Sequence, residues 1–311
     1  MEYSNTHGTH DSIGEKHKSV LLNEVLKYLD IKNGDLVLDG TLGAGGHSLA
    51  ICKKLGSGGV LIGLDLDNTA IGIAKKVLDT CDIKSFFKQE NFRNMDKVLK
   101  ELGYEEVDKI LLDLGISSMQ LDQSGRGISF KKDEPLIMTL KDTVTEEDTT
   151  AKEIVNTWAE ESIADVIYGF GGERFARRIA RKIVELRKKH TIETTFQLVE
   201  AIEAAVPVWY KNGRINPSTK TFQAIRMAVN DEVGSLSDGL DKGISLLKSG
   251  GRMAVISFHS VEDKIVKNKF KEKQKEGVVN ILTKKPIRPS TEEIKENPRA
   301  RSSKLRVIEK R

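Results

Sequence analysis

Short apolar runs alternate with amphipathic segments through the first third of the chain. The apolar runs lie at residues 36–38, 60–64, 83–87 and 107–113. The segments between them carry apolar residues at helical spacing, namely at 47–55, 68–78 and 95–102. Strands buried on both faces read as continuous apolar runs, whereas helices show a period near 3.6. The alternation therefore predicts an α/β fold, with a mostly parallel sheet and helices packed on it.

The pattern changes in the middle of the chain. Between residues 122 and 220 only helical spacing is present, and it predicts helices near 151–158, 161–168, 173–189 and 195–204. Strand signals return at 253–258 and 305–309, with 278–282 as the expected neighbour of the last strand. We therefore expect an all-helical domain inserted into the sheet domain.

These patterns divide the chain into domains. The sheet domain comprises residues 15–121 and 221–311, and the helical insert comprises residues 122–220. Residues 1–14 are polar and aperiodic, which is typical of a disordered tail. His7 and His10 could bind a metal, but we interpret this segment as an untethered tail.

A glycine-rich turn follows the first predicted strand. Gly43, Gly45 and Gly46 can adopt left-handed backbone angles and let the chain approach a ligand closely. The turn leads into a helix, whose first N–H groups favour anions. Asp65 ends the second strand about twenty residues later, where a carboxylate can accept both hydroxyls of a ribose. The unit therefore predicts a nucleoside-cofactor site.

The spacing of this turn bears on which cofactor binds. A dinucleotide fingerprint requires G-x-G-x-x-G/A, but Ser48 stands at the third position. Asp39 and the glycines instead form D-x-x-x-G-x-G, which is similar to the first motif of the class I S-adenosylmethionine (SAM) methyltransferases. The pattern favours SAM, with a nicotinamide or flavin dinucleotide, or a turn without a ligand, as alternatives.

Four residues with candidate ligand-binding side chains follow the ends of the predicted strands: Asp39, Asp65, Phe92 and Asp113. The carboxyl ends of parallel strands meet at one edge of a sheet, where ligands bind. We therefore expect these side chains to converge. Phe92 could equally be a core residue, but its position just past the third strand favours contact with an adenine.

Composition restricts the class of protein. A net charge of +4 over 311 residues permits binding to nucleic acid without requiring it. Cys52 and Cys81 have no metal-ligand spacing and do not suggest a disulfide framework, and neither follows a proline as a cytosine-C5 methylating nucleophile would. No apolar run approaches a membrane span and no signal peptide is evident, so we expect a cytoplasmic protein without a metal.

Basic residues gather on the predicted helix at 173–189. Helical spacing turns Ile179 and Ile183 inward, and turns Arg174, Arg178 and Arg181 outward. This basic face is either solvated or binds phosphates.

Several long motifs resemble one family, the bacterial 16S ribosomal RNA cytosine-N4 methyltransferases, also called the RsmH or MraW family. The motifs are DGTLGAGGHS (39–48), LLDLGISSMQLD (111–122), GERFARRIA (172–180), TFQAIRMAVNDE (221–232), GGRMAVISFHSVEDKIVK (250–267) and NPRARSSKLRV (297–307). The resemblance implies a class I SAM-dependent fold, with a helical domain after the fourth strand that helps recognise RNA. It also implies methylation of a cytidine exocyclic amine in the decoding region of the small ribosomal subunit.

The resemblance carries residue roles with it. The cofactor contacts that it implies are Gly45, Gly46, His47, Asp65, Phe92, Asp113 and Gln120. The candidate contacts to 16S rRNA are arginines that could hold phosphates, namely Arg174, Arg178, Arg181, Arg299 and Arg301. His47 and Gln120 come from the family alone, since by themselves they read as a helix-start residue and a surface residue.

The chain departs from the family pattern at three places. Ser19 replaces a proline, PLIMTL at 135–140 replaces PLDMRM, and Asn216 replaces a histidine. We expect all three to lie away from the cofactor turn, so that they affect contacts with the substrate and not with SAM.

The chemistry requires a hydrogen-bond acceptor for the amine, because cytosine N4 shares its lone pair with the ring. The stretch DLGISS differs from the D/N/S-P-P-Y/F of many amino-methylating enzymes. Asp113 and Ser117 are candidate acceptors, although Asp113 could instead hold only the cofactor. His259 is a further candidate general base, with helix capping as its alternative role.

Three rival functions stay open on the sequence. A non-catalytic RNA-binding protein could keep this fold, and a methyltransferase could act on a protein or a small molecule. A NAD-dependent oxidoreductase is disfavoured by the absent third glycine and by Asp39. The sequence also leaves open a homodimer.

Overall fold

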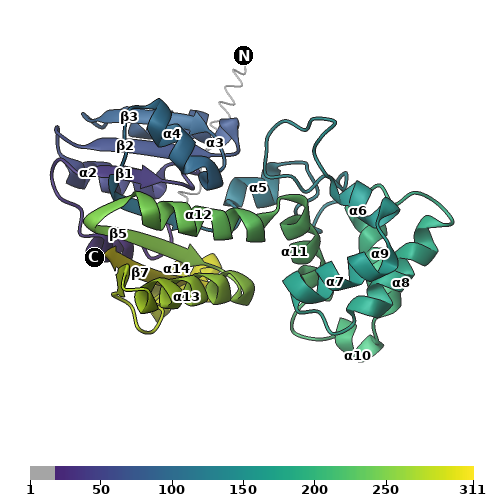
Figure 1. Cartoon of the computed structure of the whole chain (residues 1–311). Helices are drawn as coiled ribbons and strands as arrows, with labels where there is room; N and C mark the ends of the chain where they lie inside the picture. The colour runs from purple at the N-terminus through teal and green to yellow at the C-terminus, as the bar shows by residue number, and fades with distance from the viewer. Residues whose placement is uncertain (1–17) are drawn as a thin grey trace, which may run out of the picture.

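The computed structural model describes residues 18–311, and for Ser118 and Gln123 only the backbone (Figure 1). The predicted tail at 1–14, with His7 and His10, lies outside the described residues.

Within residues 18–311 one sheet holds seven strands in the order β3-β2-β1-β4-β5-β7-β6. The strands are β1 (Leu36–Asp39), β2 (Val60–Asp65), β3 (Lys84–Gln89), β4 (Val107–Asp113), β5 (Leu247–Ser257), β6 (Val279–Ile281) and β7 (Lys304–Lys310). Only β7 runs antiparallel to its neighbours, and its pairing with β6 confirms the predicted partner of the last strand. The mostly parallel sheet confirms the predicted class I methyltransferase fold.

Helices cover both faces of the sheet. On one face lie α1 (Leu22–Leu29), α2 (Gly46–Leu55) and α3 (Asn68–Leu78), and on the other lie α4 (Met95–Glu101), α12 (Glu232–Leu246) and α13 (Ser260–Lys275). Along β1, Leu36 and Leu38 join one core and Val37 joins the other. A strand that is buried on both faces needs apolar residues at every position. The same continuous apolar runs predicted these strands.

The segment after β4 is helical. It contains α5 (Ser118–Gln123), α6 (Ala151–Thr157), α7 (Glu160–Gly171), α8 (Ala176–Arg187), α9 (Thr195–Ala205) and α10 (Val208–Lys211). From α6 onward, the helices of this segment pack around a separate hydrophobic core. Phe222 and Ile225 of α11 (Ser218–Val229) complete that core. Figure 1 shows this group beside the sheet, joined to it by α11 and α12. The domain boundaries at residues 122 and 220 stay a prediction.

Three short helices were not expected: α5, α10 and α14 (Thr291–Glu296). Each has six residues or fewer, which is too short for apolar periodicity to show.

The cysteines depart from expectation. Cys52 of α2 and Cys81, just after α3, form a disulfide with a Cα–Cα distance of 6.3 Å. The two helices pack side by side, which a separation of 29 residues along the chain does not reveal.

None of the described helices is long and apolar enough to cross a membrane.

Candidate functional site

A cavity of about 990 Å³ opens at the carboxyl edge of the sheet, beyond the ends of the neighbouring strands β1 and β4. This is the position at which open α/β sheets bind ligands, because the strand order reverses there. The predicted site residues that line it are Gly46, His47, Asp65, Phe92, Asp113, Ser117, Gln120 and Arg299. The predicted residues outside its lining are Gly45, Arg174, Arg178, Arg181, His259 and Arg301.

Asp39 fixes the glycine turn and does not line the cavity. Its carboxylate is buried and accepts hydrogen bonds from the Thr41 N–H (3.1 Å) and the Ser48 hydroxyl (2.7 Å). Burial raises the pKa of Asp39, although these hydrogen bonds act in the opposite direction. Asp39, expected to face a ligand, instead connects the end of β1 to α2.

The glycines of the turn allow close packing. Gly43 and Gly45 have φ angles of 51° and 82°, in the left-handed region that favours glycine. A Cβ atom on Gly46 would collide with the hydroxyl of Ser19. Ser19, expected away from the turn, therefore packs directly on it and lines the cavity.

Asp65 connects the same turn to β2. One carboxylate oxygen accepts the Gly43 N–H at 2.7 Å, and the other accepts the Asp67 N–H at 2.9 Å. Burial raises the pKa of Asp65, and the two backbone hydrogen bonds oppose this effect. A carboxylate offers about four lone-pair sites, so both oxygens can still accept a ligand hydroxyl.

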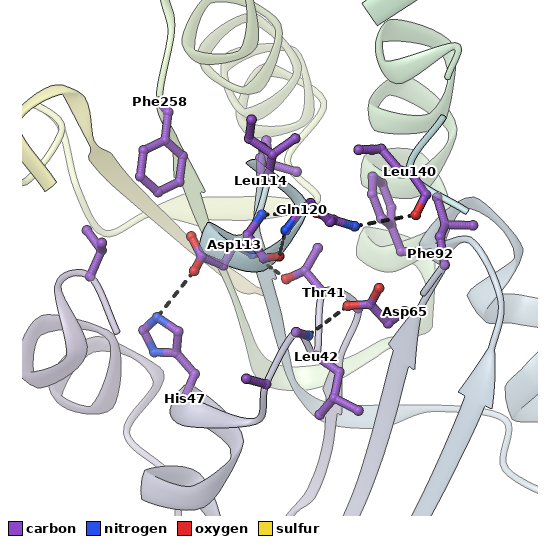
Figure 2. Close-up of a pocket in the computed structure, with 18 of the residues that line it drawn as sticks. Thr41, Leu42, His47, Asp65, Phe92, Asp113, Leu114, Gln120, Leu140 and Phe258 are labelled. Carbon is purple, nitrogen blue, oxygen red and sulfur yellow. Dashed lines mark hydrogen bonds and ion pairs between the residues drawn. The ribbon is translucent and has the colours of Figure 1, made fainter. Parts of the chain in front are cut away.

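His47 and Asp113 face each other across the cavity floor (Figure 2). His47 Nε2 lies 3.5 Å from an Asp113 carboxylate oxygen, within ion-pair distance but longer than an ordinary hydrogen bond. Both His47 nitrogens and the other Asp113 oxygen are buried without a hydrogen-bond partner among the described residues. Burial lowers the pKa of His47, but the interaction with Asp113 outweighs it, and the pKa is raised.

Phe92 is held against the opposite wall. It begins the 3-10 helix η1 (Phe92–Asn94), whose cap is the Asn91 side chain, which accepts the Arg93 N–H at 2.9 Å. A Cβ atom on Gly239 would lie 2.5 Å from the Phe92 ring, so this glycine makes room for it. Phe92 therefore both packs on the core and lines the cavity.

Ser117 and Gln120 form a reciprocal cap at the start of α5. The Ser117 hydroxyl accepts the Gln120 N–H at 3.1 Å, and the Gln120 side-chain oxygen accepts the Ser117 N–H at 3.0 Å. The Gln120 amide also donates to the Leu140 carbonyl at 3.4 Å, and Leu140 lines the cavity. The altered segment 135–140, expected away from the cofactor turn, thus reaches the same cavity.

His259 caps α13. Its Nδ1 accepts the Glu262 N–H at 3.4 Å, and its Nε2 lies 3.1 Å from the Glu262 carboxylate. Burial would raise the pKa of Glu262, but the interactions with His259 lower it overall. Glu262 lines the cavity, whereas His259 does not.

Glu232 lies beside this pair and also lines the cavity. Ligand atoms of Glu232, His259 and Glu262 lie within 4.8 Å of one another, a spacing that could hold a metal ion. Buried Arg226, however, donates to both Glu232 oxygens at 2.7 and 3.0 Å. A guanidinium that already neutralises the carboxylate leaves less negative charge for a cation.

The predicted RNA-binding arginines occupy three places. Arg299 pairs with Asp122 at the cavity wall, and Arg301 is exposed nearby on the 3-10 helix η2 (Pro298–Ser302). Arg174, just before α8, stacks over Trp209 at 4.6 Å from the ring centre. The exposed Arg178 and Arg181 lie on α8 itself, which Figure 1 shows in the helical group, away from the sheet.

Sequence reasoning did not assign many of the lining residues to the site, and three of these are Ser19, Glu232 and Phe258. Phe258 directly follows β5, so the strand-end argument that selected Asp113 could have found it. Ser19 and Glu232 come from segments that carry no glycine turn and no strand end, and only the fold brings them to the cavity.

Known proteins of one family match this chain along almost its whole length. The model of the MraW methylase family matches residues 14–311. The ribosomal RNA small subunit methyltransferase H of Clostridium botulinum (strain Kyoto / Type A2) is 44% identical over 310 residues, which covers 95% of this chain and 99% of that protein. The protein of the same name from Sulfurihydrogenibium sp. is 44% identical over 292 residues, covering 94% and 98%.

A solved rRNA methylase from Streptococcus thermophilus is a more distant likeness, with 10% identity and a TM-score of 0.44 over 95% of this chain and 98% of that one. The family match spans both the sheet and the helical group. The chain therefore belongs to the MraW methylase family.

Proposed function

We propose that this protein transfers the methyl group of SAM to the exocyclic N4 amine of a cytidine in the decoding region of 16S rRNA. Membership of a methylase family and the name of the 44% identical relatives support the reaction class and the rRNA substrate. The observation that carries the proposal is the set of buried, unpartnered polar atoms of His47 and Asp113 in the cavity.

The cavity residues fit a SAM molecule. Buried polar atoms without partners are rare in proteins, and a ligand with complementary groups explains them. Asp113 would receive the ammonium of the methionine part, and the turn at Gly46, which lines the cavity, would hold its carboxylate. Asp65 would accept the ribose hydroxyls, and Phe92 would contact the adenine. Bound SAM supplies an electrophilic methyl group on a sulfonium.

The contribution of the protein is mainly alignment. Holding a nucleophile and a methyl group in line can contribute roughly 7–11 kcal/mol, so no metal is required. Ser117 is tied into the α5 cap, and His259 into the α13 cap. With His47 beside it, Asp113 serves the cofactor, which leaves the acceptor for the amine to be identified.

We propose that the helical segment at 122–220 forms a substrate domain. Its exposed arginines, with Arg301, would hold RNA phosphates around the cavity entrance and on the helical group. Such a protein would act in the cytoplasm, where ribosomal subunits are assembled. A homodimer stays a prediction, which sedimentation velocity would test.

Mapping N4-methylcytidine in 16S rRNA tests the proposal directly. Cells with the protein should carry the modification at one site in the decoding region, and cells without it should lack it. Purified protein should also bind SAM in a calorimeter. A protein that binds rRNA but releases no heat with SAM would instead be a non-catalytic relative.

A further inference from the structure

Among the described residues, two aromatic side chains line the cavity, Phe92 and Phe258. Figure 2 shows them at opposite sides, with Phe92 near Asp65 and Phe258 on the side of His47 and Asp113. Phe92 therefore lies where the adenosyl part of the cofactor would bind. Phe258 lies beyond the carboxylate that would hold the amino-acid part, and the proposed function leaves it without a role.

The Phe258 ring is fixed in place. Its backbone N–H donates to a Glu262 oxygen at 2.8 Å, which anchors the residue to the first turn of α13. Gly115 lies against the ring, and a Cβ atom there would stand 3.4 Å from it. Gly115 also has a φ of 95°, so glycine is favoured at this position and leaves the ring face clear of a side chain.

A carboxylate completes this end of the cavity. Both Glu232 oxygens are held by Arg226, and the Glu232 side chain is 15% exposed toward the cavity it lines. Each oxygen keeps a lone pair that Arg226 does not use. The ion pair with Arg226 thus fixes the direction of the Glu232 carboxylate, which can still accept a hydrogen bond from a ligand.

We propose that Phe258 and Glu232 form the subsite for the target base, with the cytosine stacked on the phenyl ring and its N4–H donated to the carboxylate. The inference rests on the proposed function and names the residues that select its substrate. Bases taken out of a strand are read by stacking on aromatic side chains and by hydrogen bonds to their edges. A carboxylate accepts from the amine of cytosine but repels the carbonyl oxygen that uracil carries at the same position.

This subsite also supplies the acceptor that the chemistry needs. A hydrogen bond from N4–H to Glu232 would concentrate the lone pair on N4. As N4 bonds to the methyl carbon, the bond from that carbon to sulfur would break, S-adenosylhomocysteine would leave and Glu232 would accept the N4 proton. Asp113 is less suited, because one oxygen lies 3.5 Å from His47 and the other is the natural partner of a cofactor ammonium.

Matched substitutions of the two aromatic residues test the stacking role. Phe258→Leu should leave the SAM dissociation constant within about twofold and lower kcat/KM for 16S rRNA methylation by about 5- to 150-fold, the usual effect of removing one stacking side chain. Phe258→Tyr, which keeps a flat ring, should recover most of the activity. Phe92→Leu should instead weaken SAM binding.

Wild-type kinetics for Phe258→Leu, or a loss of SAM binding equal to that of Phe92→Leu, would overturn the assignment. Failure of the proposed function can be distinguished from failure of this subsite assignment. If the proposed function were wrong, the unaltered protein would form no N4-methylcytidine at all.

Glu232→Gln tests the choice of base without relying on turnover. Saturation-transfer NMR with free cytidine and uridine, in the presence of S-adenosylhomocysteine, should show a preference for cytidine in the unaltered protein. Glu232→Gln should reduce that preference several-fold, because an amide can also donate to the uracil oxygen. An unchanged SAM dissociation constant would report an intact fold, and an unchanged preference would refute the role of Glu232.

Discussion

At the scale of single residues, His47 and Asp113 bury more hydrogen-bonding capacity than the described chain satisfies. A buried polar group left without a partner costs about 1–3 kcal/mol. A ligand that paired with these groups would explain why they are retained, and both residues line the cavity. If these atoms bind SAM as proposed, the affinity for SAM should depend on the charge of both side chains.

Asp113→Asn should weaken SAM binding by about 10- to 150-fold. The substitution keeps the shape of the side chain but removes a charge-assisted hydrogen bond, which contributes about 1.5–3 kcal/mol. Calorimetric titration with SAM measures the change. Asp241→Asn, which breaks an exposed pair with Lys269, should leave the affinity unaltered.

The raised pKa of His47 makes stability depend on pH. A group whose pKa is higher in the folded than in the unfolded state stabilises the fold below its unfolded pKa, here the ordinary 6.5. That contribution is lost as the pH rises from 6.5 through the raised value. The free energy of unfolding in urea should therefore fall, as the pH rises above 6.5, more steeply than in His47→Gln. Parallel curves would show that His47 does not titrate in this range.

At the scale of elements, a buried ion pair connects α3 to the start of the helical segment. Asp67 caps α3 by accepting the Thr69 N–H at 2.9 Å, and it also accepts Arg126 Nη2 at 3.0 Å. Both side chains are at most 10% exposed. The ion pair therefore holds α3 and the start of the helical segment together. Both of these parts of the chain lie beside the cavity.

Asp67→Ala should destabilise the protein by about 3–5 kcal/mol. The substitution removes the cap and leaves the Arg126 guanidinium buried without its carboxylate. Urea unfolding followed by circular dichroism measures the change. Glu185→Ala, which removes an exposed pair with Lys182, should leave the free energy of unfolding nearly unchanged. An equally small effect at Asp67 would mean that solvent reaches Arg126.

Elements also show what the sequence could predict. Strands β1, β2 and β4 match their predicted ranges, because buried parallel strands leave unbroken apolar runs. The turn at 40–46 and Asp65 came from spacing alone. The contact of Ser19 with Gly46 and the disulfide could not be predicted, since each joins segments whose proximity depends on how helices pack.

At the scale of the whole molecule, basic residues extend far from the cavity. Arg178 and Arg181 are exposed on α8, and Figure 1 shows that helix in the group joined to the sheet through α11 and α12. A substrate that reached both places would have to be large, as a ribosomal RNA is. The small net charge of +4 indicates that local clusters, and not the overall charge, would guide it.

Charge reversal at both Arg178 and Arg181 should weaken methylation of 16S rRNA about tenfold or more at physiological salt, because each arginine would lose a phosphate contact. SAM affinity should stay the same. Methylation rates at several salt concentrations, with calorimetry alongside, measure both effects. Equal loss of both would indicate a folding defect.

The place of β7 inside the sheet has a consequence for the order of events during synthesis. β7 lies between β5 and β6, and residues 296–299 just before it contribute to the cavity wall. A nascent chain that has emerged only as far as β5 therefore presents an open sheet edge and a pocket that lacks the wall formed by residues 296–299. Such a chain already carries the proposed cofactor contacts, but its pocket would stay open on one side until residues 296–299 had been added.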